Sequence, residues 1–251
     1  MSIDPILQIM LNVFSLIFVV VNLLVGARII SKYFELRNKV FIYIGFAWIG
    51  IAFPWLPEIF NLIFRLINLQ ANDLFLLILF AIVNLIVIPP FVILWILALN
   101  KLTGIRDIFK KILLISAIIL SVVFELFIFV FLSIDSPLVG KVSETREYTV
   151  NWSTYVNLLL IVLLVFILVT GLIFGKESLN SKDTTVNLKG KFLLSAFVLF
   201  AIAAALDSIF TVQTSYGIIL KIIARIMLMV SSILFYIGFI MPERIENWLI
   251  K

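Results

Sequence analysis

The apolar stretch 216–240 constrains the fold more than any other part of the chain, because it is long enough to cross a membrane yet carries Lys221 and Arg225 in its first half. On a helix at about 100° per residue, these two cations and the polar residues Ser232 and Tyr236 fall within roughly 60° of arc. A cation facing hydrocarbon costs at least ~2.5 kcal/mol and needs a partner. This face must therefore lie against other parts of the protein, which have to form an interior around it.

The composition makes a bilayer the solvent of this chain. Hydrophobic residues make up 64% of its 251 residues and charged residues only 13%, whereas a soluble domain has about 45–50% apolar and about 25% charged residues. The chain has no Cys and no His, which argues against zinc-dependent membrane proteases, haem proteins and His-based hydrolases. We therefore expect no enzyme, no catalytic residue, no cofactor and no metal site.

A membrane span needs about 20 apolar residues, and the chain offers seven such stretches. They cover residues 6–30, 40–64, 74–102, 112–134, 155–175, 192–212 and 218–240. The sequence thus predicts an all-α fold, a polytopic bundle of seven transmembrane helices occupying residues 1–241. The tail 242–251 has Ile245, Trp248 and Leu249 on one helical face, which indicates a short amphipathic helix on the inner membrane surface.

The distribution of Lys and Arg predicts the orientation. Of 19 such residues, four lie in each of the segments 28–39, 101–111 and 176–191, two lie in the tail, and five lie elsewhere. Under the positive-inside rule the amino terminus is outside and the carboxyl terminus cytoplasmic, in a multi-pass protein of the cell membrane. The basic loops are expected to meet anionic membrane lipid or a cytoplasmic protein partner. Because the positive charge lies beside membrane spans, it indicates no nucleic-acid partner.

Prolines and glycines mark irregular or close-packed places in the spans. Pro54 and Pro57 interrupt the second span and the pair 89–90 interrupts the third, which predicts fixed bends or, as the alternative, a moving hinge. The pattern Gly171-x-x-x-Gly175 allows a neighbouring helix to approach closely, within the bundle or in a dimer. The loop stretch 141–150 alternates loosely and is rich in Thr, Val and Tyr, which indicates a short β-hairpin.

Several ionisable or amide side chains fall inside the predicted spans, all of them in the half that the orientation places outside. At about 1.5 Å per residue, Arg225 and Asp207 lie roughly 8–10 Å below the outer ends of their helices. Glu58 has a similar depth, and Glu125 and Asn84 lie about 14–15 Å in. Such groups are candidates for function by default.

Two interpretations of these charges compete. In the first, Asp207 pairs with Arg225 or Lys221 across the last two spans and forms a structural ion pair. In the second, the charges surround a polar cavity open to the outside that binds a small-molecule ligand or an ion. The candidate ligand-binding residues are Asn84, Glu125, Asp207, Lys221 and Arg225. We expect Glu125 to face the bundle and, with Ser121 and Asn84, to form a polar pocket between the third and fourth spans.

Two resemblances bear on the fold. The topology is similar to that of microbial rhodopsins, but their retinal-binding Lys near the middle of the last helix is absent, since the segment 229–236 contains none. The segments 27–41 and 45–51, with Pro54 and Trp55, resemble uncharacterised seven-helix integral membrane proteins of archaea. This second resemblance covers about a tenth of the chain and implies a fold without assigning a role to any residue.

Three functions remain open at this level. The leading hypothesis is a seven-helix receptor or sensor that binds a ligand from outside. The second is a transporter or ion pathway that uses Glu125, Asp207 and Arg225 as a relay. The third is a non-catalytic membrane scaffold or subunit with structural charges. A cavity closed below and open above favours sensing, a continuous polar path favours transport, and a dry, fully paired outer half favours a scaffold.

Overall fold

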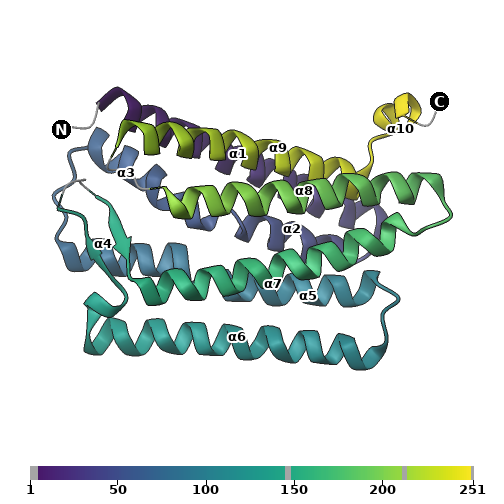
Figure 1. Cartoon of the computed structure of the whole chain (residues 1–251), viewed down its shortest axis with the longest axis horizontal. Helices are drawn as coiled ribbons and strands as arrows, with labels where there is room; N and C mark the ends of the chain where they lie inside the picture. The colour runs from purple at the N-terminus through teal and green to yellow at the C-terminus, as the bar shows by residue number, and fades with distance from the viewer. Residues whose placement is uncertain (1–4, 145–147, 211–213, 250–251) are drawn as a thin grey trace.

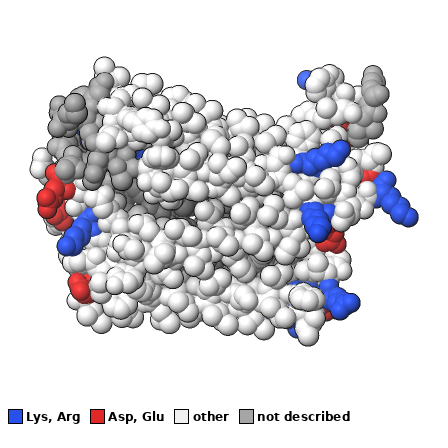
Figure 2. Space-filling model, in the orientation of Figure 1, with Lys and Arg blue, Asp and Glu red and all other residues white. Residues whose placement is uncertain are grey.

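The computed structural model describes residues 5–144, 148–210 and 214–249 and has the predicted all-α fold (Figure 1). Within these ranges, seven helices are long and apolar enough to cross a membrane. The fold class inferred from the apolar stretches is therefore confirmed. Figure 2 shows charged side chains gathered at the two ends of the molecule, with an uncharged surface between them.

The helices and strands follow one another in the order in which the spans were predicted. They are α1 (Pro5–Leu36), α2 (Val40–Gly50), η1 (Phe53–Trp55), α3 (Leu56–Leu66), α4 (Asp73–Phe80), η2 (Ala81–Ile86), α5 (Ile88–Leu102), α6 (Asp107–Ile134), η3 (Ser136–Leu138), β1 (Gly140–Val142), β2 (Val150–Trp152), α7 (Thr154–Leu179), α8 (Thr184–Ile209), α9 (Ser215–Ile240) and α10 (Glu243–Leu249). The second span comprises α2, η1 and α3, and the third comprises α4, η2 and α5.

Several helices run past the predicted spans. Helix α1 continues to Leu36, beyond residue 30, and α8 begins at Thr184, eight residues before 192. The apolar stretch measures only the part in hydrocarbon, whereas backbone hydrogen bonds continue through the polar interface until a cap ends them. The cap of α8 is Asp183, whose carboxylate accepts hydrogen bonds from the amides of residues 185 and 186. The predicted end of the sixth span, at 212, lies outside the described residues.

The prolines break two spans, as predicted. The second span changes from α-helix to the short 3₁₀-helix η1 around Pro54 before α3 begins. In the third span the π-helix η2 comes just before Pro89 and Pro90. Proline has no amide hydrogen and its ring crowds the carbonyl four residues earlier, so the preceding turn widens. The bends are present in the structure; whether they move remains a prediction to be tested.

The spans form a ring around a shared interior. Helix α1 packs on α2, α3 and α9; α8 packs on α7 and α9; and α5 packs on α2, α7 and α6. Helix α6 lies on the edge of the bundle, as Figure 1 shows. The predicted β-hairpin is present, with β1 and β2 antiparallel and Lys141 opposite Asn151. We call the end of the bundle that carries this hairpin the hairpin end, and the opposite end, with the links 37–39, 103–106 and 180–183, the basic end.

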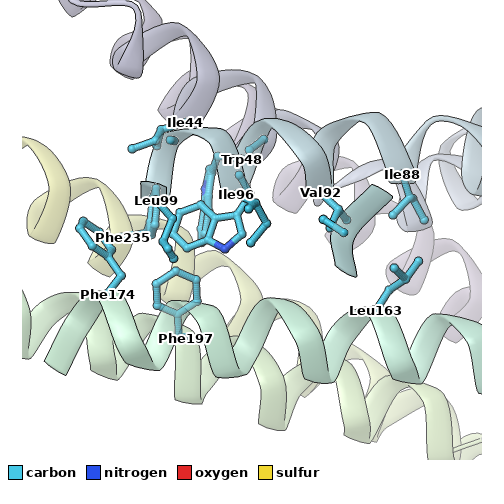
Figure 3. Packing of buried hydrophobic residues seen from close by; sticks show 14 of the residues in the cluster. Ile44, Trp48, Ile88, Val92, Ile96, Leu99, Leu163, Phe174, Phe197 and Phe235 are labelled. Atoms are coloured by element: carbon cyan, nitrogen blue, oxygen red, sulfur yellow. The ribbon is translucent and has the colours of Figure 1, made fainter. Parts of the chain in front are cut away.

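Toward the basic end the interior is filled by aromatic rings and tight helix contacts. Trp48 of α2 and Phe235 of α9 stack with ring centroids 3.5 Å apart, and Phe197 of α8 meets the Phe235 ring edge-on (Figure 3). A Cβ on Gly171 would lie 2.5 Å from the Phe197 ring, and one on Gly175 would lie 2.7 Å from Leu194. The GxxxG pattern therefore brings α7 against α8 within the bundle.

Candidate functional site

Arg225 is the centre of a cluster of charges in the hairpin half of the bundle. It lies on α9 and is only 1% exposed. Its Nη1 is 2.7 Å from Oδ1 of Asp207 on α8, and its Nη2 is 3.1 Å from Oε1 of Glu58 on α3. Its Nε donates to Oγ of Ser15 on α1 at 2.8 Å. One guanidinium thus joins four helices, and the face that carries it lies inside the protein, as its polarity requires.

Asp207 has three partners. Besides Arg225, its carboxylate lies 3.2 Å from Nζ of Lys221 and accepts a hydrogen bond from the indole Nε1 of Trp55 at 3.1 Å. Lys221 also donates to the Asp207 backbone carbonyl at 2.6 Å. The ion pair anticipated between Asp207 and Arg225 is present, and the pair with Lys221, which was the alternative, is present as well.

Glu58 and Ser15 complete the cluster on its other side. Ser15 donates to Oε2 of Glu58 while accepting from Arg225. The ring of Trp55 lies over the guanidinium, 5.5 Å from Cζ to the ring centroid, which adds a cation–π contact. Two carboxylates and two cations balance within this group. Because a buried charge is most costly when left without a partner, these ion pairs offset the desolvation of each charge and connect the helices that carry them.

A cavity of about 600 Å³ lies beside this cluster. Glu58, Asp207 and Lys221 are part of its wall, whereas Arg225 lies behind them and is enclosed. The side chains of these three residues are 14–18% exposed, and that of Arg225 is 1% exposed. Ligand pockets typically measure about 300–1,000 Å³ and combine an apolar lining with a few placed polar groups. This cavity has that size and that mixture.

The β-hairpin covers one side of the cavity at the hairpin end of the bundle. Tyr148, Thr149 and Asn151 of the hairpin contribute to the wall. Asn61 of α3 fixes the hairpin by donating to the Tyr148 carbonyl at 3.3 Å and to the Thr149 hydroxyl at 3.2 Å. Asn61 also accepts a hydrogen bond from Asn12 of α1 at 3.0 Å. Polar contacts therefore connect the cover of the cavity to the same helices that hold the charge cluster.

Aromatic and aliphatic side chains close the cavity toward the basic end. Trp48, Trp95 and Phe197 belong both to its wall and to the buried apolar core. The ring centroids of Trp95 and Phe197 lie 5.3 Å apart. The Trp95 indole hydrogen bonds to Thr170 at 2.9 Å, which leaves that polar atom satisfied. Apart from the indole Nε1 of Trp48, which has no hydrogen-bond partner among the described residues, the floor is apolar and closely packed.

The five predicted ligand-binding residues do not share one surface. Asn84, Asp207 and Lys221 line the cavity, and Arg225 supports it from behind. Glu125 does not line the cavity: it is half-buried, at the edge of the buried face of α6, and its carboxylate has no hydrogen-bond or ion-pair partner among the described residues. The predicted pocket joining Asn84 to Glu125 therefore needs correction. Helix α6 lies on the rim of the bundle, and Glu125, at the edge of its buried face, is not among the residues that line the cavity with Asn84.

Other residues that matter here were not selected from the sequence. Glu58 was noted as an intramembrane acid but not as a site residue, and Ser15 belonged to a polar face of α1 interpreted as a packing seam. That face does pack: Asn22 donates to the carbonyl of Trp48 and accepts from Ser232 at 2.8 Å. The depth of Glu58, which matches that of Arg225, was the signal that could have linked the two.

The composition of the cluster limits its chemistry. Its carboxylates point at cations, and among the described residues no group of three or more His, Cys, Asp or Glu side chains could hold a metal ion. The chain matches no protein-family model and no curated protein. The function is therefore inferred from the geometry of the site.

Proposed function

We propose that the protein is a seven-helix membrane receptor or sensor that binds a small molecule in the cavity of the hairpin half. The observation that carries this proposal is a cavity of about 600 Å³ in the hairpin half, with a polar wall and a closed aromatic floor. The positive-inside rule places this half on the outer side of the cell membrane, so the ligand would come from outside.

The closed floor favours sensing over transport. A transport path would need polar groups that continue from the cavity to the basic end. Below the cavity the interior contains Ile44, Ile96 and Leu99 in one apolar cluster. Glu125, which the transport hypothesis uses as a relay, does not line the cavity. A relay from Asp207 through Glu125 therefore has no continuous route among the described residues.

The scaffold hypothesis fits the paired charges but not the cavity. A bundle in which Asp207 and Arg225 serve only to lock helices needs no space beside them. Well-packed interiors have few voids larger than a water molecule, and about 600 Å³ next to the cluster is far more. The volume supports ligand binding as the role of this half of the bundle.

The broken spans give a way for binding to be sensed. Pro54 beside η1 and Asn84 in η2 both contribute to the cavity wall. A ligand shifts a conformational equilibrium only as far as it binds one state better than the other. Contacts at two irregular turns would let it favour one bend of the second and third spans. At the basic end these two spans continue into the links between helices, where a change of bend would reach anionic lipid or a cytoplasmic protein.

The resemblance of segments 27–41 and 45–51 to archaeal seven-helix proteins fits this proposal, since it covers the link at the basic end and the start of the second span. It suggests that this part of the architecture is shared with those proteins. It adds no ligand and no partner.

A pair of neighbouring cysteine variants tests the proposal, because the chain has no Cys of its own. Ala204 of α8 lines the cavity and Ala203 does not, although both are buried on the same turn. We expect a small impermeant methanethiosulfonate, added to sealed vesicles on the hairpin side, to modify Ala204→Cys and not Ala203→Cys. The same reagent on the basic side should modify neither.

The three functions give three different labelling patterns. Modification of Ala204→Cys from the hairpin side alone supports a cavity that ends at its floor. Modification from both sides would favour a transport pathway and contradict the sensor hypothesis. No modification from either side would mean a dry interior and would favour the scaffold. The yield for Ala203→Cys measures the background from transient opening of the helices in each case.

A further inference from the structure

Two buried polar atoms on the cavity wall lack a partner. Oδ1 of Asn84 and Nε1 of Trp48 have no hydrogen-bond partner among the described residues. Asn84 is 4% and Trp48 is 3% exposed, and both line the cavity. Buried polar groups in native structures nearly always have a partner, so each exception calls for an explanation. Here Oδ1 of Asn84 can accept a hydrogen bond and Nε1 of Trp48 can donate one.

Local structure explains why Asn84 is left in this position. It lies in the π-helix η2, directly before the prolines of the third span. Such π segments are rare and frequently occur at functional sites. The amide of Asn84 makes no hydrogen bond to any described residue, whereas the Asn61 and Asn12 side chains pair with each other. The position of Asn84 thus leaves an amide available to the cavity.

The charges in the wall argue for a neutral ligand. Asp207, Glu58, Lys221 and Arg225 are already paired and balance one another. An added charge in this interior would lack a counter-ion, and unpaired charge is costly in a bilayer. The two atoms without partners belong to an amide and an indole, both neutral. A ligand that satisfies them needs a hydrogen-bond donor and an acceptor but no charge.

The remaining wall and its surroundings argue for an apolar ligand body. Ile161 of α7 is 45% exposed and Ile209 of α8 is 69% exposed, and both also line the cavity. Figure 2 shows the surface hollowed on the face where, in Figure 1, α7 and α8 run. This face belongs to the uncharged middle of the molecule, which lipid would surround. An amphiphile dissolved in the membrane could therefore reach the cavity from the side.

We propose that the cavity binds a neutral amphiphile whose alcohol or amide group donates to Asn84 and accepts from Trp48, with its chain among the aromatic rings of the wall. This inference rests on the proposed function and specifies its ligand class. Asn84 and Trp48 are then the residues that select the head group.

Brominated twelve-carbon chains test the head group by quenching tryptophan fluorescence. Four of the five tryptophans line the cavity, and the fifth, Trp248, is 79% exposed on α10. In a Trp248→Phe background every remaining tryptophan therefore reports on the cavity. The probes are 12-bromododecan-1-ol, 1-bromododecane and 12-bromododecanoic acid, titrated into protein in lipid nanodiscs. We expect saturable quenching by the alcohol, with a midpoint at least about tenfold lower than for the alkane or the acid, because each of the two hydrogen bonds of the alcohol corresponds to about that factor.

Variants assign the preference to the two residues. Asn84→Leu keeps a side chain of similar size without the amide and should weaken alcohol binding about tenfold while leaving alkane binding unchanged. Trp48→Phe, which keeps an aromatic ring opposite Phe235, should weaken it similarly. Asn100→Leu is the control, since Asn100 lies on α5 outside the cavity and hydrogen bonds to the Lys110 carbonyl. It should leave all three midpoints unchanged.

The outcomes separate this inference from the proposed function. Equal saturable quenching by alcohol and alkane, unchanged in Asn84→Leu, would overturn the head-group assignment and leave a cavity that binds ligands. Tighter binding of the acid than of the alcohol would contradict the inference that the ligand is neutral. Absence of saturable quenching by every probe overturns the ligand class. If Ala204→Cys is still modified from the hairpin side alone, the proposed cavity function survives that result.

Discussion

The hairpin half and the basic half of the bundle are built in different ways, although the same seven helices pass through both. In the hairpin half, directional contacts among charged and polar side chains connect α1, α3, α8 and α9 around Arg225. In the basic half, helices meet through glycines: a Cβ on Gly26 would lie 2.8 Å from the Gly45 carbonyl, and one on Gly190 would lie 2.4 Å from the Leu179 amide nitrogen. Ion pairs and hydrogen bonds connect the helices of the hairpin half, whereas close backbone approach at glycines connects those of the basic half.

This difference explains where the cavity lies. Close packing of apolar side chains leaves little room, because interiors pack like organic crystals. A cluster of paired charges fixes helices at the distance its side chains span, and space can remain beside it. Helices in a bilayer gain little from burying apolar surface, so packing and polar contacts decide how they associate. The polar half can therefore hold a cavity, whereas the glycine half leaves little space between its helices.

The largest expected effect concerns the sides of the membrane on which the two halves lie. The positive-inside rule places the basic end in the cytoplasm. An impermeant thiol reagent on intact cells should modify Ser143→Cys, beside β1, and leave Ser181→Cys, between α7 and α8, unmodified. The expected difference is all or none, and permeabilised cells provide the control in which both react. The opposite pattern would invert the topology and put the cavity on the cytoplasmic side.

The next effect tests whether the hairpin half depends on its charge pairs. Asp207→Asn removes the charge that Arg225 and Lys221 share, and breaking a buried pair typically costs about 3–5 kcal/mol because a bare charge remains. We expect the free energy of unfolding in detergent to fall by about that amount. Glu144→Gln, an exposed change in the hairpin loop, should alter it by less than about 0.5 kcal/mol. Equal effects would mean that water screens the cluster.

The sequence is enough to predict the spans and part of the cluster. The length of each apolar stretch sets the helices, and cations on α9 must face inward, so Asp207 at matched depth on the next helix is their natural partner. Glu58 could not be placed in the same way. Its direction depends on the turn at η1, which rotates α3 relative to α2, and one sequence does not specify that rotation.

The positions of the cavity and of Glu125 show the same limit of prediction from one sequence. Depth along a helix follows from counting residues, and this count predicts Asn84 and Glu125 at similar levels. The level alone does not give the rotation of each helix about its own axis. Helix α6 packs on α5 and η2 of the third span, yet Glu125 lies at the edge of its buried face and does not line the cavity that Asn84 lines. The rotation of a helix about its axis comes from tertiary packing, and no local pattern encodes it.

A smaller effect is expected from overpacking the basic half. A Cβ on Gly45 would lie 2.3 Å from Ile30 and 2.7 Å from the Gly26 carbonyl, so α1 and α2 would have to separate. Gly45→Ala should therefore lower the free energy of unfolding by about 1–3 kcal/mol. Gly104→Ala is the matched control, since its nearest contact is the Glu177 carboxylate at 3.1 Å. If Gly45→Ala did not change the free energy of unfolding, α1 and α2 could separate without cost and close packing would not distinguish this half.

The smallest effect is expected at Glu125, the intramembrane acid that belongs to neither kind of packing. It lies on α6 at the edge of the buried face, with Phe124 and Ser121 buried beside it and Leu126 56% exposed. Its carboxylate has no partner among the described residues to lose, and Gln has nearly the same shape. Glu125→Gln should therefore change the free energy of unfolding by no more than about 0.5 kcal/mol.

The same variant also tests the separation between Glu125 and the cavity. Because Glu125 does not line the cavity, Glu125→Gln should leave the midpoint for 12-bromododecan-1-ol unchanged, whereas Asn84→Leu moves it. A shift in that midpoint would bring Glu125 back into the site. A loss of 2 kcal/mol or more, which exceeds about 0.5 kcal/mol for an ordinary surface change, would instead reveal a partner beyond the described contacts. Measuring that loss at several protein-to-lipid ratios then decides whether the partner is a second copy of this chain, since only an intermolecular contact depends on dilution.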